Sequence, residues 1–435
     1  MPEKTFHSWG RTHPIQSEAV QAVWRRSLPA VSGDRLPFGL GRSYGDSCLL
    51  SGGTMIETAG LNRLISFDPE TGVIIAEAGL TLDALLLYSV PKGWFLPVTP
   101  GTRLVTLGGA IANDIHDKNH HRAGTFGCHV SWLTLHRSDG QVLDVSPSQH
   151  PDLFAATVGG LGLTGLITVV ALRLRPITSA LVDAELIRFS GIAEFMAIAE
   201  QSEAGFEHTV AWLDCVSSGQ QLGRGIFIRG NHADGPPSEL IAHGPPKLSV
   251  PINFPEFCLN RLSVTVFNAL HYYRLLGKRK FVKQHYSSFF HPLDSVNGWS
   301  RIYGKRGFFQ YQCVVPSDGG TYVMNEMLKQ ISASGQASFL AVLKTFGDVP
   351  SPGLLSFPRP GITLALDFAN QGASTLGLFA RLDNIVRSAH GAWYPAKDAR
   401  MSSADFNASY PALDRFLPLV DPAFTSDFWK RMTAT

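Results

Sequence analysis

The sequence predicts an α+β protein of two domains. Its 435 residues exceed the roughly 250–300 residues at which a single hydrophobic core stops growing. With 44% hydrophobic and 17% charged residues, the composition is that of a globular chain rather than a disordered one. Glycine-rich loops dominate up to Pro176, whereas strand and helix patterns alternate from 180 to 345. We therefore expect a second, α+β domain to begin near residue 176.

Short elements alternate with turn signals at the start of the chain. Residues 16–28 read as a short helix because apolar side chains recur there. β-Branched runs at 54–58 and 73–78, separated by the turn signal 68–72, predict two strands. Thr81 is followed by an early aspartate and several leucines, so it predicts the start of a helix.

A hairpin is expected around residues 138–140, followed by a short helix from Pro151. The uncharged segment 155–172 reaches the lower limit for a membrane-spanning helix. Glycines fill its first half and β-branched residues its second, so we expect a glycine turn that enters a buried strand. The glycines at 159–165 resemble a dinucleotide fingerprint, but the strand, turn and helix unit that this motif needs is missing.

The second half of the chain has longer elements. Strands are expected at 182–189 and 307–315, with helices at 191–201 and 320–334. A further helix is expected at 402–410.

Two glycine-rich stretches are candidate cofactor sites. The segment 100–127 combines adjacent glycines with histidines and a lysine, and glycine lets a backbone approach a ligand closely. The loop 37–46 has glycine at 39, 41 and 45, so its amide groups and Arg42 could hold a diphosphate. A tight surface turn is the alternative for this loop.

Other candidate residues have an ordinary explanation beside the functional one. Lys397 could be a surface charge or a buried cation at a site. His116 could be a core histidine with one hydrogen bond or part of the site. The segment 257–293 contains no acid and interleaves basic with aromatic residues, which suits a membrane interface or a lipid-phosphate headgroup, or else a solvated helix face.

Net charge and cysteine content argue against several kinds of partner and site. A net charge of +2 gives no general attraction to polyanions, so we expect no nucleic-acid partner. Five cysteines without CxxC spacing indicate neither a disulfide framework nor a metal site. The residues after Met1 lack the apolar stretch of a signal peptide, so we expect a cytoplasmic protein, peripheral to the inner membrane if it contacts one.

Five motifs in one order resemble a known family. They are GLGRSYGD (39–46), PGTRLVTLGGAIANDIHDKNHHRAGTFG (100–127), TVGGLGLTG (157–165), GFFQYQ (307–312) and YPAKDAR (394–400). The chain is similar through them to the decaprenylphosphoryl-β-D-ribose oxidases, FAD-dependent enzymes of the vanillyl-alcohol oxidase fold. The similarity runs from about residue 10 to 431 and is weak at 216–280.

This resemblance implies a PCMH-type FAD-binding domain at 1–175, a substrate domain at 176–392 and a C-terminal segment, 393–435, that returns to the FAD domain. Tyr44 stands where related oxidases carry a histidine bonded to FAD, so the FAD is expected to be noncovalent. The implied FAD-binding residues are Gly39, Leu40, Gly41, Arg42, Ser43, Tyr44, Gly45, Asp46, Gly101, Thr106, Leu107, Gly108, Gly109, His116, Asp117, Lys118, Asn119, Ile167 and Tyr394.

The resemblance also implies which residues take part in catalysis and which bind the substrate. Lys397 matches the essential lysine of the family, with His116 and Tyr44 as neighbours that could accept or relay a proton. The implied substrate-binding residues are Lys118, Trp212, Tyr303, Gln310, Gln312, Lys344 and Lys397.

Four positions depart from the family pattern. Asp117 replaces a glycine, Thr363 an asparagine and Val210 a serine, while Ala365 stands where mycobacterial members carry a cysteine. These changes bear on which glycosyl group the site accepts.

The implied activity is oxidation of the 2-hydroxyl of a polyprenyl-phosphoryl-β-D-ribose, the first half of an epimerisation to the arabinose form used in cell-envelope polysaccharide. Its partners would be an NAD(P)H-dependent short-chain reductase and either quinone or oxygen as electron acceptor. The alternatives are an oxidase of a free sugar, alditol or sugar lactone, a noncatalytic flavoprotein disabled by Asp117, and a nicotinamide dehydrogenase suggested by the glycines at 159–165.

Overall fold

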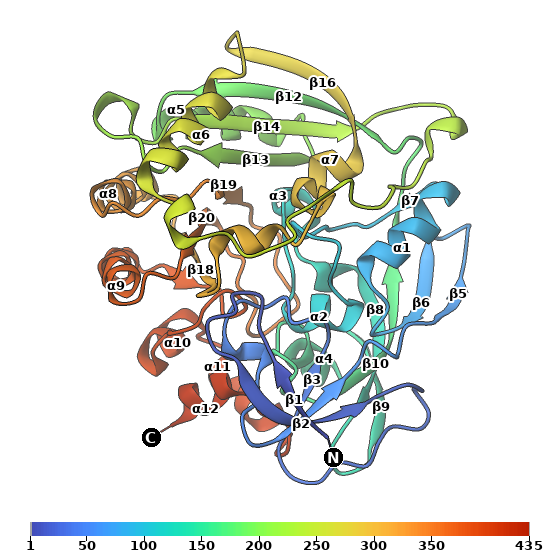
Figure 1. The fold of residues 1–435 in the computed structure, drawn as a ribbon. Helices are drawn as coiled ribbons and strands as arrows, with labels where there is room; N and C mark the ends of the chain where they lie inside the picture. The colour runs from blue at the N-terminus through green and yellow to red at the C-terminus, as the bar shows by residue number, and fades with distance from the viewer. Residues whose placement is uncertain (1, 435) are drawn as a thin grey trace.

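Residues 2–434 are described by a computed structural model, which contains two sheets near the N-terminus and one large sheet further along the chain (Figure 1). The first sheet has the order β1-β2-β4-β3 and consists of β1 (Glu3–Phe6), β2 (Ile15–Gln21), β3 (Arg35–Phe38) and β4 (Thr54–Glu57). β4 pairs in parallel with both β2 and β3. The loop 39–46 leaves this sheet directly after β3.

The helix predicted at 16–28 is wrong, because β2 occupies Ile15–Gln21. Its burial alternates, with Ser17 and Ala19 buried between exposed Gln16, Glu18 and Gln21. This period of two matches a strand between two partners, β1 and β4. Pairing across the sheet therefore overrode the local helical pattern.

The second sheet is antiparallel. Its order is β5-β6-β10-β8-β9, from β5 (Leu64–Phe67), β6 (Val73–Glu77), β8 (Val130–His136), β9 (Val142–Val145) and β10 (Leu166–Arg173). Four helices accompany it, namely α1 (Leu82–Ser89), α2 (Leu107–Ala112), α3 (His120–Ala123) and α4 (Pro151–Thr157). A small pair, β7 (Trp94–Phe95) and β11 (Arg175–Pro176), ends this part of the chain.

Most local predictions for this region are confirmed. Thr81 caps α1, since its hydroxyl oxygen accepts a hydrogen bond from the Ala84 amide at 3.1 Å. The predicted hairpin around 138–140 joins β8 to β9, and Pro151 starts α4. The segment 155–172 is the expected glycine turn leading into buried β10. Within residues 2–434, no helix is both long and apolar enough to span a bilayer.

The large sheet contains eight antiparallel strands in the order β16-β12-β14-β13-β19-β20-β18-β21. They are β12 (Leu181–Phe189), β13 (His208–Leu213), β14 (Gly225–His232), β16 (Arg279–His285), β18 (Phe308–Val315), β19 (Ala341–Phe346), β20 (Gly361–Ala369) and β21 (Ala392–Trp393). The strands and helices predicted between 182 and 334 are confirmed.

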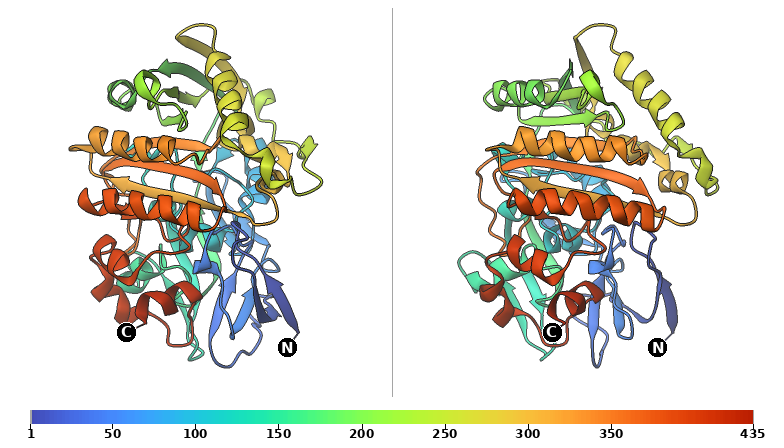
Figure 2. Two further views of the ribbon diagram at one scale, coloured as in Figure 1. Left: turned by 60° about the vertical axis from the view of Figure 1, so that its left-hand side comes forward. Right: turned by 90° about the vertical axis from the view of Figure 1, so that its left-hand side faces the viewer.

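Three helices cover one face of this sheet, α5 (Ile192–Glu203), α8 (Gly320–Ala333) and α9 (Ala373–Ser388) (Figure 2). Phe195, Met324 and Leu382 from these helices join the largest buried apolar cluster. The opposite face carries α6 (Arg261–Tyr273) and α7 (Tyr286–Phe290), together with the short pair β15 (Leu248–Ser249) and β17 (Val296–Asn297). That opposite face is the one left available for a site.

The C-terminal helices α10 (Ser403–Ser409), α11 (Leu413–Phe416) and α12 (Asp427–Thr433) run back toward the N-terminal sheet (Figure 1). Arg431 of α12 forms an ion pair with Asp46 at 2.9 Å, and Asp427 accepts hydrogen bonds from the amide and hydroxyl of Ser51. The domain limits at 175 and 392 stay a prediction.

Candidate active site

A cavity of about 1320 Å³ lies between the N-terminal sheets and the face of the large sheet that carries α6 and α7. Its walls come from the loop after β3, the segments 100–118 and 157–167, strands of the large sheet and the segment 394–397. Pockets for drug-sized ligands measure roughly 300–1,000 Å³, so this cavity has room for a large cofactor together with a substrate.

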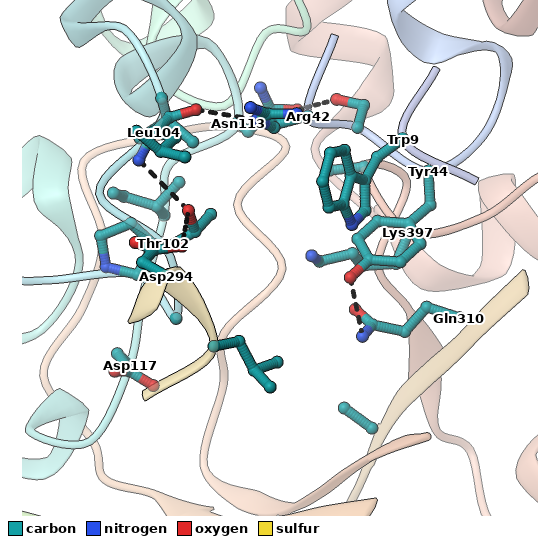
Figure 3. Close-up of a pocket in the computed structure, with 18 of the residues that line it drawn as sticks. Trp9, Arg42, Tyr44, Thr102, Leu104, Asn113, Asp117, Asp294, Gln310 and Lys397 are labelled. Atoms are coloured by element: carbon teal, nitrogen blue, oxygen red, sulfur yellow. Dashed lines mark hydrogen bonds between the residues drawn. The ribbon is translucent and has the colours of Figure 1, made fainter. Parts of the chain in front are cut away.

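The cavity brings together most of the residues predicted for the site. Those that line it are Gly39, Leu40, Gly41, Arg42, Ser43, Tyr44, Gly101, Thr106, Gly108, Gly109, His116, Asp117, Lys118, Ile167, Trp212, Gln310, Gln312, Lys344, Tyr394 and Lys397. Figure 3 shows Trp9, Tyr44, Lys397 and Gln310 on one side of the cavity, opposite Thr102, Asp294 and Asp117.

Five predicted residues lie behind the walls instead, namely Gly45, Asp46, Leu107, Asn119 and Tyr303. Leu107 is buried in the apolar cluster beneath the second sheet, and Asp46 is paired with Arg431. The Asn119 amide donates to the Pro97 carbonyl at 2.8 Å. These three side chains therefore hold the scaffold together.

Gly45 and Tyr303 also have structural positions. A Cβ on Gly45 would lie 1.6 Å from the Asp398 carbonyl oxygen, so only glycine lets the loop pack on that segment. Tyr303 stacks on Phe308 with ring centroids 4.3 Å apart and planes at 8°. Its hydroxyl has no hydrogen-bond partner within residues 2–434, and burial raises its pKa well above the usual value.

The loop 39–43 is suited to an anion. The main-chain amides of residues 39–42 make no hydrogen bond to any other residue between 2 and 434, whereas the Ser43 amide is hydrogen-bonded to the Cys48 thiol. Arg42 is fixed beside them, because its Nε donates to the Leu104 carbonyl at 2.9 Å and its guanidinium lies 4.2 Å from the Trp9 ring centroid. Free amide donors and a positioned guanidinium are the chemistry that holds a diphosphate. This arrangement favours the cofactor interpretation of the loop over the surface turn.

A second wall starts at Thr106, the N-cap of α2. Its hydroxyl oxygen accepts from the Gly109 amide at 3.1 Å, and the Gly108 amide donates to the Ala78 carbonyl at 2.7 Å. A Cβ on Gly108 would lie 3.2 Å from that of Ala78, so glycine allows α2 to start close against the second sheet. Gly101 has no atom within 4 Å of its added Cβ and is open toward the cavity. These glycines leave space for a flat group.

Lys397 is partly buried in the opposite wall. Its Nζ lies 4.1 Å from the centroid of the Tyr44 ring, within cation–π range. Burial lowers the pKa of Lys397 below that of a free lysine, while the charge of Asp367 acts in the other direction. The ammonium group is therefore easier to deprotonate than a surface lysine.

Asp367 and Gln310 form a hydrogen-bonded chain with Tyr44. The Gln310 Nε2 donates to Asp367 Oδ1 at 2.5 Å and to the Tyr44 hydroxyl oxygen at 3.3 Å. Asp367 is fully buried, and this burial raises the pKa of its carboxyl. Its Oδ2 has no hydrogen-bond partner within residues 2–434. These hydrogen bonds link the Asp367 carboxyl, through Gln310, to Tyr44, whose ring contacts Lys397.

His116 combines a core packing role with a place in the cavity wall. Its ring packs between Phe346, Phe357 and Tyr394, with centroids 5.0 to 5.4 Å away. Gln312 lies 3.2 Å from its Nε2. Burial, and next the charge of Lys344, lower the pKa of His116 well below the usual value. His116 is therefore neutral at physiological pH. Its ring can donate one hydrogen bond and accept another, but it carries no positive charge.

Asp117 lies between two lysines. Its Oδ2 accepts from Lys118 Nζ and its Oδ1 from Lys344 Nζ, each at 2.9 Å. All three side chains are at least nine-tenths buried. The acid that departs from the family pattern is thus part of a buried ionic triad in the cavity wall.

Some residues of the cavity wall were not predicted from the sequence. Trp9, Asn113 and Asp294 line the cavity. Asp294 fixes the turn at 102–103, accepting from the Thr102 hydroxyl at 2.7 Å and the Arg103 amide at 2.8 Å. The Tyr394 hydroxyl donates to the Asn113 carbonyl at 2.7 Å. Trp9 and Asp294 lie outside the five motifs, and Asn113 lies within the second one without a distinguishing pattern, so only the folded chain reveals their position.

Comparison with known proteins identifies the cofactor. Residues 13–146 match the FAD binding domain family. This stretch contains the loop 39–43 and most of the second wall, whose donors and open glycines fit the dinucleotide. FAD is therefore the cofactor, which replaces the nicotinamide alternative, and the predicted α+β fold of the vanillyl-alcohol oxidase type is confirmed.

Relatives extend the match over the whole chain. A decaprenylphosphoryl-β-D-ribose oxidase of Mycolicibacterium smegmatis is 37% identical over 99% of this chain and 97% of its own length. An uncharacterised protein of Streptomyces coelicolor is 32% identical over 81% of this chain and all of its own. L-gulonolactone oxidase of Mus musculus is 33% identical over only 28% of each chain. The chain therefore belongs to the decaprenylphosphoryl-β-D-ribose oxidase family of FAD-dependent oxidoreductases.

Proposed function

We propose that the protein oxidises the 2-hydroxyl of a polyprenyl-phosphoryl-β-D-ribose to the 2-keto sugar. The observation that carries this proposal is the position of Lys397, whose Nζ packs on the buried Tyr44 ring in a wall of the FAD-sized cavity. A relative that matches this chain almost end to end bears the name of an oxidase of that substrate. The keto sugar would be the first product of an epimerisation to the arabinose form.

The cofactor would lie along the glycine-bearing walls. The free amides of residues 39–42 and the Arg42 guanidinium would hold its diphosphate, and Thr106 to Gly109, Ile167 and Tyr394 would border its ring. Tyr44 stands in the loop without a histidine beside it, which supports noncovalent binding. When bound, FAD supplies the acceptor for the hydride that leaves the substrate carbon.

The chain itself must remove the hydroxyl proton. Lys397 is our candidate, because burial lowers its pKa and so makes the neutral amine available. The aromatic face of Tyr44 keeps the Lys397 ammonium in place, and Gln310 fixes the Tyr44 hydroxyl. His116 is neutral and hydrogen-bonded to Gln312, so it could orient a sugar hydroxyl or relay the proton.

The rest of the substrate would contact the large sheet and the ionic triad. The residues that line that side of the cavity are Trp212, Gln310, Gln312 and Lys344, and Lys118 joins Lys344 through Asp117. The completed epimerisation needs an NAD(P)H-dependent short-chain reductase to reduce the keto group. Either quinone or oxygen would take electrons from the reduced cofactor.

An FAD-dependent oxidase of a free sugar, alditol or sugar lactone is the second candidate. The ionic triad favours it, because Asp117 cancels one of the two positive charges of Lys118 and Lys344. A phosphorylated substrate is attracted less by this wall than by two unopposed lysines. Asp117 thus gives a physical reason to compare phosphorylated with unphosphorylated sugars.

Absorbance spectroscopy of the purified protein tests both candidates. Polyprenyl-phosphoryl ribose, free ribose and an alditol would each be added without oxygen to the FAD-loaded protein. Bleaching of the flavin by the lipid-linked sugar alone supports the first function, and bleaching by a free polyol supports the second. A yellow protein that none of them bleaches would contradict both and favour a noncatalytic flavoprotein.

A further inference from the structure

Helix α6 stands on the outside of the molecule, beside the large sheet (Figure 2). It begins with a capping box between Asn260 and Ser263, so its start is fixed locally. Val264 and Asn268 point inward and are buried, and Leu275 just beyond the helix packs against Leu186 and Ile226. One side of the helix is therefore anchored to the protein.

The opposite side of α6 is apolar and exposed. We call it the α6 face, and it consists of Phe257, Leu262, Val266, Leu270, Tyr273 and Leu276. Leu262, Leu270 and Leu276 are 74%, 69% and 99% exposed. Positions 262, 266, 270 and 273 recur at intervals of three or four residues, so they share one side of the helix. Contiguous exposure of large apolar side chains marks an interaction site.

The unpaired charges around the α6 face are positive, since Glu256, next to Phe257, forms an ion pair with Arg306 at 3.6 Å. No acid occurs between residues 257 and 293. Lys278, Arg279 and Lys283 are neutralised by acids of neighbouring elements, at 2.6, 3.2 and 3.6 Å. Arg261, Arg274 and Lys280 form no ion pair with any acid in the described chain, residues 2–434. An apolar face bordered by unpaired cations complements a negatively charged, apolar partner.

The α6 face is continuous with the active-site cavity. Phe267 of the same helix is 46% exposed and also lines the cavity. His271, Arg274 and Lys280 extend this cavity wall. A partner that covers the α6 face therefore lies next to this part of the cavity, where a long apolar chain would enter.

We propose that the α6 face docks into the headgroup region of an anionic lipid bilayer, so that a lipid-linked substrate enters the cavity from the leaflet. The entry of substrate rests on the proposed function, whereas the docking itself does not. A 13-residue helix spans about 20 Å, too short to cross a bilayer but suited to lie in its interface. A second copy of the chain fits less well, because it would bring the same unpaired cations together.

Sedimentation with vesicles tests the docking. The FAD-loaded protein would be mixed with vesicles of phosphatidylcholine and phosphatidylglycerol, or of phosphatidylcholine alone, without substrate. We expect binding to the mixed vesicles that weakens in high salt, and weaker binding to the neutral ones. L262Q/L270Q should lower the affinity for mixed vesicles at least about tenfold, because two leucines no longer insert.

A matched variant controls for the loss of apolar surface. L87Q/L417Q changes two leucines that are also exposed but lie outside the α6 face, and it should bind as the unchanged protein does. The proposal is overturned if the unchanged protein binds neither vesicle, or if L262Q/L270Q binds as tightly as it. A dimer that L262Q/L270Q converts to a monomer would overturn it in favour of a second copy.

A separate measurement distinguishes a failure of docking from a failure of the proposed function. Flavin reduction by polyprenyl-phosphoryl ribose in detergent needs no membrane and should be unchanged in L262Q/L270Q. Loss of reduction by the unchanged protein would count against the function alone. Loss of vesicle binding with reduction intact would count against the docking alone.

Discussion

Lys344 of β19 places its Nζ 2.9 Å from the Asp117 carboxylate, joining the large sheet to the FAD-binding part of the chain. Burial alone would raise the pKa of Asp117, but the charges of Lys118 and Lys344 and their hydrogen bonds lower it well below the usual value. Asp117 is therefore ionised at every pH at which the protein would be studied. The stability that it contributes is present above the pKa of an unfolded aspartate and is lost only in strong acid.

Asp117→Asn should destabilise the protein by about 3–5 kcal/mol, because it leaves two buried ammonium groups without their countercharge. Urea unfolding at neutral pH measures this change. The exposed pair between Lys283 and Asp183 provides the control, and Asp183→Asn should cost no more than about 1 kcal/mol. If both variants lost the same small amount of unfolding free energy, the triad would not be a structural link.

Lys397→Ala should keep FAD bound but lose flavin reduction by substrate, since a contribution of about 10²–10⁴-fold is typical of a proton-accepting group. Stopped-flow absorbance measures the reduction, and the flavin spectrum confirms that cofactor remains. Lys92→Ala, at an exposed lysine of the FAD-binding part, is the control. Normal reduction in Lys397→Ala would remove this lysine from the mechanism.

Asp367→Asn should move the pH profile of flavin reduction toward lower pH. If the neutral amine of Lys397 accepts the proton, the rate rises as pH rises through the Lys397 pKa. Burial lowers that pKa and the negative charge of Asp367 raises it, so removing the charge lowers it further. Rates measured across a pH series in both proteins test the shift. An unmoved profile would mean that Asp367 does not act on Lys397.

Gly45→Ala and Gly101→Ala should differ sharply in stability. The added Cβ at position 45 would lie 1.6 Å from the Asp398 carbonyl, so the loop must shift and a loss above about 4 kcal/mol is expected. At position 101 nothing lies within 4 Å, and the cost should stay within about 0.5 kcal/mol. Thermal unfolding of the two proteins compares them. Similar melting temperatures would contradict the tight packing of the loop on the C-terminal segment.

Acid should destabilise the protein through its buried histidines. Burial, then Lys344 and His121, lower the pKa of His120 to about 4, against about 6.5 when unfolded. Between these values the unfolded state binds the extra proton, so stability falls as pH falls, by about 1.4 kcal/mol per pH unit for each such histidine.

The variant His120→Phe isolates one histidine. Both ring nitrogens of His120 lack hydrogen-bond partners within residues 2–434, and its ring packs 4.8 Å from that of Phe346. Phenylalanine can replace it without breaking a hydrogen bond. Urea unfolding at about pH 7 and about pH 5 should show a smaller loss of stability in the variant. An equal loss in both proteins would contradict the neutral state of His120.

Local patterns predicted most of the fold. Turns at 68–72 and 138–140, the cap at Thr81 and the strand β10 depend on neighbours in sequence, and the structure confirms them. The helix predicted at 16–28 failed because the sheet partners of β2 are distant in sequence, and apolar spacing alone does not reveal them. Pairing in the sheet decides such short amphipathic segments.

The sequence predicted which residues line the cavity where those residues belong to a motif. The family resemblance placed Lys397, Tyr44 and the glycine walls in one cavity. It could not show that Tyr303 turns into an aromatic stack, or that Asp367 is hydrogen-bonded behind Gln310. Such contacts depend on side-chain packing between β18, β20 and the neighbouring helices, for which the spacing of residues along the chain contains no signal.

The contact between Tyr44 and Lys397 has a consequence for biosynthesis. These residues come from opposite parts of the chain, and Arg431 ties the same N-terminal loop to the last helix. During translation the N-terminal sheets therefore emerge with one wall of the cavity still missing. The ribosome must release nearly the whole chain before that wall closes, so the complete cavity forms only at the end of synthesis.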